Sequence, residues 1–205
     1  MSLISYQEAR TWARAIKDRV ARKQMPPWHS DQSVGVTRFK SELNMTPVGA
    51  VELEFYLMDR EAAIAGRPTA RKSLINEFKP QHYQAYYLQD LDDFAPFFKD
   101  LYAFCEAQGL PAKTLISEYS PGQMEIVLRH RADVLKACDE AIMLKRLIKA
   151  CAERHGLAAT FMAKPYAEWT GSGMHIHISL GDEAGNNLFA AEDPTKNELM
   201  MHAIG

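Results

Sequence analysis

Three short segments of the chain alternate polar and apolar residues with the period of two that a half-buried β-strand shows. They are residues 51–55 (VELEF), 123–128 (QMEIVL) and 174–180 (MHIHISL). Because successive side chains of a strand point to opposite faces, each segment has one polar and one apolar face. The polar positions are Glu52, Glu54, Gln123, Glu125, His175, His177 and Ser179. If the three apolar faces pack on a common core, we expect the polar faces to line one cavity.

Predicted strands and helices alternate over the chain from Val48 onward. We predict strands at 49–57, 113–119, 123–129, 157–162 and 174–180, and helices at 91–108, 131–155 and from Pro194 onward. Residues 60–82 are predicted to form a loop, and Ser120-Pro121-Gly122 a tight turn between two strands. In the longest helix, the residues expected near one face are Leu135, Cys138, Ile142, Leu147 and Cys151. This succession of elements indicates a fold of the α/β class.

The first 47 residues have a different pattern. A capping box at Ser5-Tyr6-Gln7-Glu8, followed by apolar residues at helical spacing, predicts a helix over residues 6–23. The prolines at 26–27 end this helix because proline has no amide donor, and residues 24–47 are predicted to be an irregular linker. We therefore expect residues 1–47 to be a helical leader of unclear origin that makes few contacts with the domain at 48–205.

Composition and charge argue against several classes of partner. The 205 residues carry a formal net charge of −2, so we expect neither nucleic acid nor an anionic membrane as a general partner. No apolar run approaches the roughly 20 residues of a membrane span, and the N-terminus lacks the apolar core of a signal peptide. Cys105, Cys138 and Cys151 form no CxxC motif, which predicts reduced core residues of a cytoplasmic protein.

The polar strand faces bring together carboxylates, imidazoles and a glycine-rich turn. Taken singly, these motifs have plain structural explanations: a Glu-x-Glu strand is usually a solvated edge, and Gly171-Ser172-Gly173 fits a flexible turn. Taken together, such closely placed like charges repel one another, and a bound cation relieves the repulsion. Oxygen ligands favour Mg²⁺ or Mn²⁺, and a histidine in the set favours tolerance of Mn²⁺. A site of this kind suits phosphoryl transfer, and the lack of a GxxxxGK[ST] motif excludes a P-loop enzyme.

From about Val48 onward, the chain resembles the glutamine synthetase superfamily. The resemblance rests on four segments in the order in which the family has them: VELEFYL at 51–57, EYSPGQME at 118–125, FMAKP at 161–165 and GSGMHIHISL at 171–180. Within the superfamily, the chain looks like the branch that includes γ-glutamylpolyamine synthetases. The resemblance implies an α+β fold rich in antiparallel strands, with residues 48–205 as a partial catalytic domain.

The resemblance implies two divalent metal sites, for Mg²⁺ or Mn²⁺. Glu54, Glu118 and Glu125 would hold one ion. Glu52 and His175 would hold the second, together with a carboxylate from further along the family's chain. The metals of the family neutralise charge on the phosphoryl group that is transferred.

The resemblance also assigns substrate positions. His177 and Ser179 would lie near the nucleotide, and the backbone at Gly171 would help to hold glutamate. Thr170 stands where well-studied glutamine synthetases carry an asparagine that contacts glutamate, which leaves the substrate open. The family uses ATP to form a γ-glutamyl phosphate, which ammonia or an amine then attacks, and it works as a homo-oligomer.

These observations predict an ATP-dependent ligase that joins glutamate to ammonia or an amine. The phosphate-binding arginines and flap glutamate of the family lie beyond the position of Gly205, so the catalytic residues stay unassigned. We therefore expect a truncated domain without ligase turnover by itself. One alternative is a metal- and nucleotide-binding remnant of the enzyme. A cupin-like metalloprotein, which His175-x-His177 alone permits, is disfavoured by the Glu-x-Glu strand and by the turn between Glu118 and Glu125.

Overall fold

The computed structural model describes residues 44–70, 72–76 and 83–204 of the chain. The chain divides into two compact units, and the second unit, Thr46–Gly205, contains nearly all of the described residues. The predicted helix at 6–23 and most of the predicted linker at 24–47 lie outside the described residues. The linker prediction is wrong at its C-terminal end, because the first strand already begins at Thr46.

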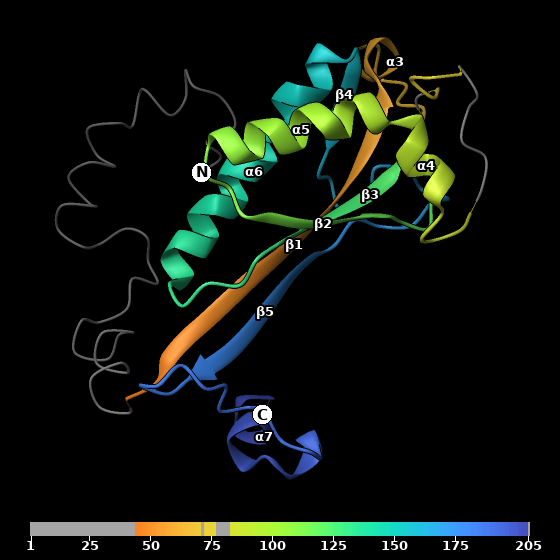
Figure 1. Ribbon diagram of the computed structural model, residues 1–205. Helices are drawn as coiled ribbons and strands as arrows, with labels where there is room; N and C mark the ends of the chain where they lie inside the picture. The colour runs from red at the N-terminus through yellow and green to blue at the C-terminus, as the bar shows by residue number, and fades with distance from the viewer. Residues whose placement is uncertain (1–43, 71, 77–82, 205) are drawn as a thin grey trace, which may run out of the picture. The chain divides into compact units, whose positions relative to one another are not determined.

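Five antiparallel strands form one sheet among the described residues. They are β1 (Thr46–Asp59), β2 (Ala112–Ser117), β3 (Gln123–Leu128), β4 (Leu157–Thr160) and β5 (Met174–Gly181). The long strand β1 pairs with β3, β4 and β5, and β2 pairs with β3 (Figure 1). The expected α/β fold rich in antiparallel strands is confirmed.

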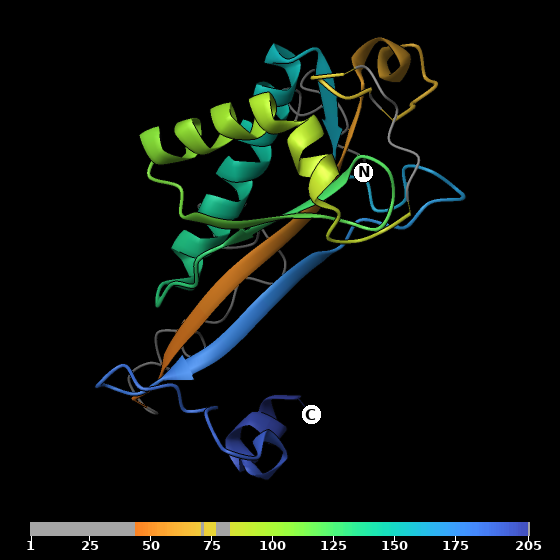
Figure 2. The same cartoon turned by 45° about the vertical axis from the view of Figure 1, so that its right-hand side comes forward.

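Helices accompany this sheet and cover part of one face. The described helices are α3 (Arg60–Ile64), α4 (Leu88–Asp93), α5 (Ala95–Ala107), α6 (Val134–Arg154), the 3₁₀-helix η1 (Pro194–Lys196) and α7 (Glu198–Ile204). Helix α6 packs against β1 and β4, and α5 packs on α6 (Figures 1 and 2). The Asp133 carboxylate caps α6 by accepting from the Lys136 backbone N–H at 3.0 Å. Of the described helices, none combines the length and the apolar content that crossing a membrane requires.

The core lies between the sheet and helices α5 and α6. The apolar face of β1 supplies Phe55 and Leu57, and that of β3 supplies Met124 and Ile126, all fully buried. The helices meet them with Phe97, Leu101, Leu144 and Ile148. The predicted apolar faces of β1 and β3 are thus confirmed, and their burial holds the opposite, polar faces in place.

The predicted apolar face of β5 does not reach this core. Met174, Ile176 and Ile178 are 60%, 59% and 64% exposed. Strand β5 pairs with Thr46–Leu53 of β1, but helix α6 packs against β1 and β4 rather than against β5. The expectation of one common core for all three strands is therefore wrong for β5.

The predicted core face of α6 is wrong in its first half. Leu135 and Ile142 are 77% and 67% exposed, and Cys138 is exposed as well. The buried stripe runs through Ala137, Ala141, Leu144, Ile148 and Cys151. A spacing of three and four residues fits two neighbouring stripes of one helix, and the small alanines mark the stripe that approaches the sheet closely. The cysteine prediction accordingly holds for Cys105 and Cys151, which are buried, but not for Cys138.

Two smaller boundary predictions also change. The helix predicted at 91–108 is two helices, because the chain breaks at Phe94, which ends α4 and precedes α5. Pro96 lies in the first turn of α5, where the missing amide hydrogen costs nothing. The loop predicted at 60–82 begins with the short helix α3, whose first turn the Asp59 side chain caps through the Ala62 backbone N–H at 2.9 Å.

The turn between β2 and β3 depends on a glycine. Gly122 has a φ of +75°, and a Cβ at this position would lie 2.8 Å from the carbonyl oxygen of Leu57. The two backbones are held together there, because the Leu57 N–H donates to the Gly122 carbonyl oxygen at 2.8 Å. Left-handed strain and steric crowding therefore act together on any side chain placed at Gly122.

We expect Gly122→Ala to lower the free energy of unfolding by about 3 kcal/mol, as measured by urea unfolding. Gly66→Ala is the matched control, because Gly66 has a φ of +71° but nothing within 4 Å of an added Cβ. The control should show only the left-handed strain, about 1 kcal/mol. Equal losses in the two variants would contradict the steric explanation.

Candidate metal and nucleotide site

The polar faces of β1, β3 and β5 meet at one place on the sheet. The pairing register places Glu54 of β1 opposite Glu125 of β3, and Glu52 of β1 opposite His175 of β5. Ligand atoms of Glu52, Glu125 and His175 all lie within 4.8 Å of one another. Three strands thus supply oxygen and nitrogen ligands to a space small enough for one divalent ion.

Two histidines approach one carboxylate. His175 Nδ1 lies 3.1 Å from Oε2 of Glu52, and His177 Nε2 lies 2.8 Å from Oε1 of the same residue. His175 Nδ1 also lies 4.0 Å from Oε1 of Glu54. Both imidazoles are more than half exposed, whereas the Glu52 and Glu54 side chains are 19% and 12% exposed. The carboxylates therefore form the floor of the site, and the imidazoles lie on its open side.

Electrostatic repulsion marks the site as one that favours a cation. Burial, followed by the neighbouring carboxylates, raises the pKa of Glu125 from its ordinary value of 4.5 to about 7. Burial first and the Glu54 carboxylate next also raise the pKa of Glu118, against a hydrogen bond from the Tyr119 backbone. His175 lowers both values because its charge is of the opposite sign. A divalent cation would relieve this repulsion, so the residues present fit the predicted Mg²⁺ or Mn²⁺.

The turn that carries Glu118 keeps this residue on the side of the site. The Glu118 N–H donates to the Gln123 carbonyl oxygen at 2.8 Å, so Glu118 pairs with Gln123 rather than with Glu125. Because Gln123 and Glu125 share one face of β3, Glu118 lies diagonal to Glu125 on that face. The predicted tight turn at 120–122 thus brings the two glutamates near each other without placing them directly opposite.

The predicted substrate residues lie next to Glu54. The segment 161–173, called the 161–173 loop below, joins β4 to β5 and carries Thr170 and Gly171. Oε2 of Glu54 accepts from the Gly173 backbone N–H at 3.0 Å and from Gln123 Nε2 at 3.2 Å. Gln123 Nε2 also donates to the Gly171 carbonyl oxygen at 2.9 Å. The loop that the sequence predicts to hold substrate is therefore in contact with a predicted metal ligand.

Two further residues of this region were missed by the sequence analysis. The Tyr56 hydroxyl donates to the Thr170 carbonyl oxygen at 2.7 Å, and the Ser120 hydroxyl lies 2.7 Å from Oγ1 of Thr170. Tyr56 follows Glu52 and Glu54 in the same alternation, so extending the polar face of β1 by one step would have found it. The sequence predicts Ser120 only as a turn residue, and no sequence pattern shows its contact with a loop 50 residues away.

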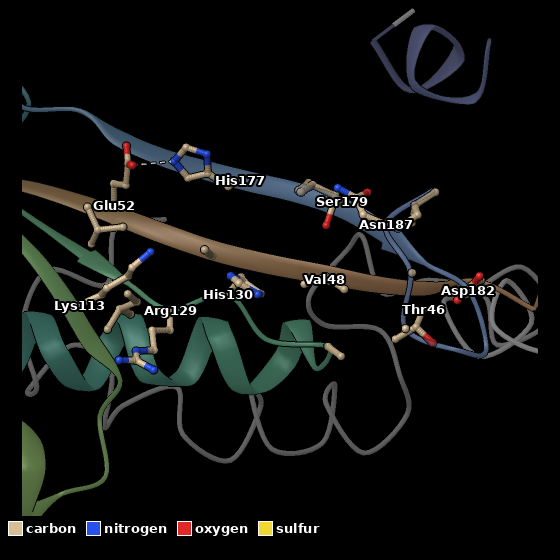
Figure 3. Close-up of a pocket in the computed structure, with 18 of the residues that line it drawn as sticks. Thr46, Val48, Glu52, Lys113, Arg129, His130, His177, Ser179, Asp182 and Asn187 are labelled. Carbon is tan, nitrogen blue, oxygen red and sulfur yellow. Dashed lines mark ion pairs between the residues drawn. The ribbon is translucent and has the colours of Figure 1, made fainter. Parts of the chain in front are cut away.

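A cavity of about 820 Å³ extends from the Glu52 end of the site along β1 and β5 (Figure 3). His177 and Ser179, which the resemblance places near a nucleotide, line one wall of this cavity. Lys113, Arg129 and His130 line it from β2 and from the segment after β3. Asp182 and Glu183 also line the cavity, and Asp182 lies at the end away from Glu52, whereas Lys113 and Arg129 lie on the Glu52 side (Figure 3). Basic side chains near the Glu52 carboxylate suit a phosphate group whose charge is shared with a metal.

The structure brings the five predicted metal ligands together at the same part of the sheet. It groups Glu125 with Glu52 and His175, whereas the resemblance assigns Glu125 to the ion held by Glu54 and Glu118. The division of the ligands between two ions stays a prediction. The roles of Thr170, Gly171, His177 and Ser179 likewise stay predictions, now with defined positions around the carboxylates.

Comparison with known proteins identifies the class. The profile of the glutamine synthetase catalytic domain matches residues 35–205, and the chain therefore belongs to the glutamine synthetase family. Among curated relatives, it is 42% identical over 158 residues to the γ-glutamylputrescine synthetase PuuA of Escherichia coli (strain K12), covering 77% of this chain and 34% of PuuA. It is 38% identical over 141 residues to a glutamate–isopropylamine ligase of a Pseudomonas species, covering 69% of this chain and 30% of that ligase.

Solved structures agree with this assignment. The chain superposes on GmaS in its ADP complex with a TM-score of 0.64 at 28% identity, over 76% of this chain and 34% of that one. Ligand-free GmaS gives a TM-score of 0.63 at 29% identity, over 76% and 35% of the two chains. The chain spans about a third of the length of these relatives.

Proposed function

We propose that the chain carries the metal- and nucleotide-binding part of an ATP-dependent ligase that joins glutamate to ammonia or an amine through a γ-glutamyl phosphate. The observation that carries the proposal is the convergence of Glu52, Glu125 and His175 within 4.8 Å of one another, next to a cavity that Glu52 lines. The names of two relatives, a γ-glutamylputrescine synthetase and a glutamate–isopropylamine ligase, favour an amine as the acceptor. A cytoplasmic location and a homo-oligomeric assembly stay predictions.

The carboxylates have a direct role in this proposal. Glu54, Glu118 and Glu125, with Glu52 and His175, would hold Mg²⁺ or Mn²⁺. Such ions neutralise the charge of the phosphate groups and act as Lewis acids on the transferred one. The protein's own contribution is to hold these ligands on paired strands, whose register is fixed by the buried apolar faces behind them.

The two substrates would bind on opposite sides of the carboxylates. The cavity on the side of His177 and Ser179 would take ATP, with Lys113 and Arg129 near its phosphates. The 161–173 loop on the other side would take glutamate at the Gly171 backbone. This arrangement would place the γ-phosphate and the side-chain carboxylate of glutamate on either side of the metal ligands, as in-line transfer requires.

Binding of ATP tests the nucleotide half of the proposal. In isothermal titration calorimetry with Mn²⁺ present, we expect wild-type protein to bind ATP and His177→Ala to bind it about tenfold more weakly, the loss typical of a hydrogen bond to a charged group. His202→Ala on α7 is the matched control, because His202 is exposed and does not line the cavity. Wild-type protein that binds no ATP would contradict the proposal.

Binding of glutamate separates the ligase from its main alternative. A ligase domain binds glutamate as well as ATP in the presence of Mn²⁺, and calorimetry measures both. Binding of Mn²⁺ and ATP without glutamate would instead favour a metal- and nucleotide-binding remnant that lacks ligase activity.

A further inference from the structure

Gln123 lies at the junction between the carboxylate site and the 161–173 loop. Its residue exposure is 1%, and its side-chain amide is fully hydrogen-bonded. Nε2 donates to Oε2 of Glu54 at 3.2 Å and to the Gly171 carbonyl oxygen at 2.9 Å. One amide group therefore holds a predicted metal ligand and the predicted substrate loop at the same time.

The neighbours of Gln123 allow only one orientation of the amide. Oε1 faces two donors, the Thr170 hydroxyl at 2.5 Å and the Ser120 backbone N–H at 3.4 Å. A flipped amide would place its NH₂ against these donors and its oxygen against the carboxylate of Glu54. Because both ends of such a flip lose their hydrogen bonds, the bridge has a fixed direction.

The loop side of this bridge is itself constrained. The Ser172 N–H donates to the Ala163 carbonyl oxygen at 2.9 Å, which closes the 161–173 loop on itself. The Thr170 N–H donates to the Ser120 hydroxyl oxygen at 3.0 Å. The side chain of Lys164 donates to the Trp169 carbonyl oxygen within the same loop. A displacement of the Gln123 amide would therefore move the loop as a unit rather than a single peptide group.

We propose that Gln123 is a positioning residue that couples the metal-binding carboxylate Glu54 to the 161–173 loop. This inference rests on the proposed function, because it requires that Glu54 binds a metal. When a metal fixes the Glu54 carboxylate, the Gln123 amide fixes the Gly171 carbonyl group, and the loop is held ready for substrate. Space filling alone does not explain the arrangement, since an apolar side chain of the same size would fill the volume without linking the two groups.

The coupling is measured by hydrogen exchange at the Thr170 and Ser172 amides. Neither amide contacts Glu54, so any effect of Mn²⁺ on them must be transmitted. In wild-type protein, we expect saturating Mn²⁺ to slow both exchange rates by about tenfold. A factor of this size corresponds to the free energy that a hydrogen bond to a charged group contributes. In Gln123→Met, which keeps the size of the side chain but has no amide, this slowing should be lost at the Thr170 amide at saturating Mn²⁺. At the Ser172 amide it should only be reduced, because the neighbouring Gly173 N–H donates directly to Oε2 of Glu54 at 3.0 Å.

Gln89→Met is the matched control, because Gln89 Nε2 also donates to a carboxylate, Oδ1 of Asp93 at 3.2 Å, but away from the site. It should leave the Mn²⁺ effect unchanged. If circular dichroism shows that Gln123→Met does not fold, Thr170→Val replaces it, since it removes the hydroxyl that donates to Gln123 while keeping the side-chain shape. We expect Thr170→Val to reduce the Mn²⁺ effect on the Ser172 amide.

The outcomes separate the two hypotheses. Equal slowing by Mn²⁺ in wild type and in a folded Gln123 or Thr170 variant overturns the positioning role and leaves the metal site intact. Slowing in wild type and Gln89→Met that is lost in the variant supports the positioning role. Wild-type protein that binds no Mn²⁺ in calorimetry overturns the proposed function, and the coupling with it.

Discussion

Glu125→Gln is expected to make the metal-free protein more stable above pH 7. The pKa of the Glu125 carboxyl group rises from 4.5 to about 7 on folding, so the folded state disfavours the ionised form. The folded state therefore binds the proton more tightly than the unfolded state. The contribution of this group to stability is most favourable below about pH 4.5, falls as the pH rises to about 7, and then stays low. Glutamine does not ionise, so the substitution removes this penalty.

The measurement is urea unfolding in the presence of a chelator at pH 5 and at pH 8. Wild-type protein should lose stability between these values relative to Glu125→Gln, and the variant should be the more stable protein at pH 8. Glu153→Gln is the control, because Glu153 is exposed on α6 and remote from the carboxylate cluster. If the free energy of unfolding changes equally with pH in wild type and in Glu125→Gln, ionisation of Glu125 is not the cause of the loss of stability.

Removal of the Glu125 carboxylate, which should stabilise the metal-free protein, should weaken the binding of metal. We expect Glu125→Ala to weaken Mn²⁺ binding at least tenfold at pH 8, a loss of about 1.4 kcal/mol or more. Because protons compete with the metal for the carboxylate, the affinity of wild type should also fall as the pH drops below about 7. In the alanine variant, that part of the pH dependence should be absent. Calorimetry with Mn²⁺ at pH 6 and pH 8 measures both effects.

Glu153→Ala serves as the control for metal binding and should keep the affinity of wild type. Unchanged affinity in Glu125→Ala would exclude Glu125 as a ligand. Weaker binding at pH 8 but an unchanged pH dependence would mean that Glu125 binds the metal while another group titrates. Comparison with Glu118→Ala then identifies that group, since the pKa of Glu118 is raised by the same causes.

The alternation of polar and apolar residues was sufficient to predict the faces of β1 and β3. It failed for β5 because alternation shows that a strand has two faces but not whether a neighbour covers the apolar one. Ile176 and Ile178 follow the same pattern as Leu53 and Phe55, yet only the latter lie under a helix. On α6, Leu135 and Ile142 follow a helical spacing as regular as that of the buried stripe, and only packing against the sheet distinguishes the two stripes.

The site was more predictable on its strand side than on its loop side. Glu52, Glu54 and Glu125 were found because their positions follow from strand alternation and the strands pair with each other. The bridge through Gln123 depends on the path of the 161–173 loop, which no periodic pattern encodes. The break between α4 and α5 at Phe94 is likewise not encoded in a periodic pattern. The Phe94 ring is fully buried, and its tertiary packing overrides the local helix propensity there.

The pairing of Glu52 with His175 joins residues that are 123 positions apart. The hairpin of β2 and β3, by contrast, forms between residues close in sequence. Closing the longer distance costs more chain entropy, so the β1–β5 ribbon is expected to form late in folding. The histidines would then reach the carboxylates late in folding, when the glutamates already lie close together and repel one another. Divalent ions available at that moment would speed refolding, and the supply of metal in the cell would influence how much of the chain reaches its native state.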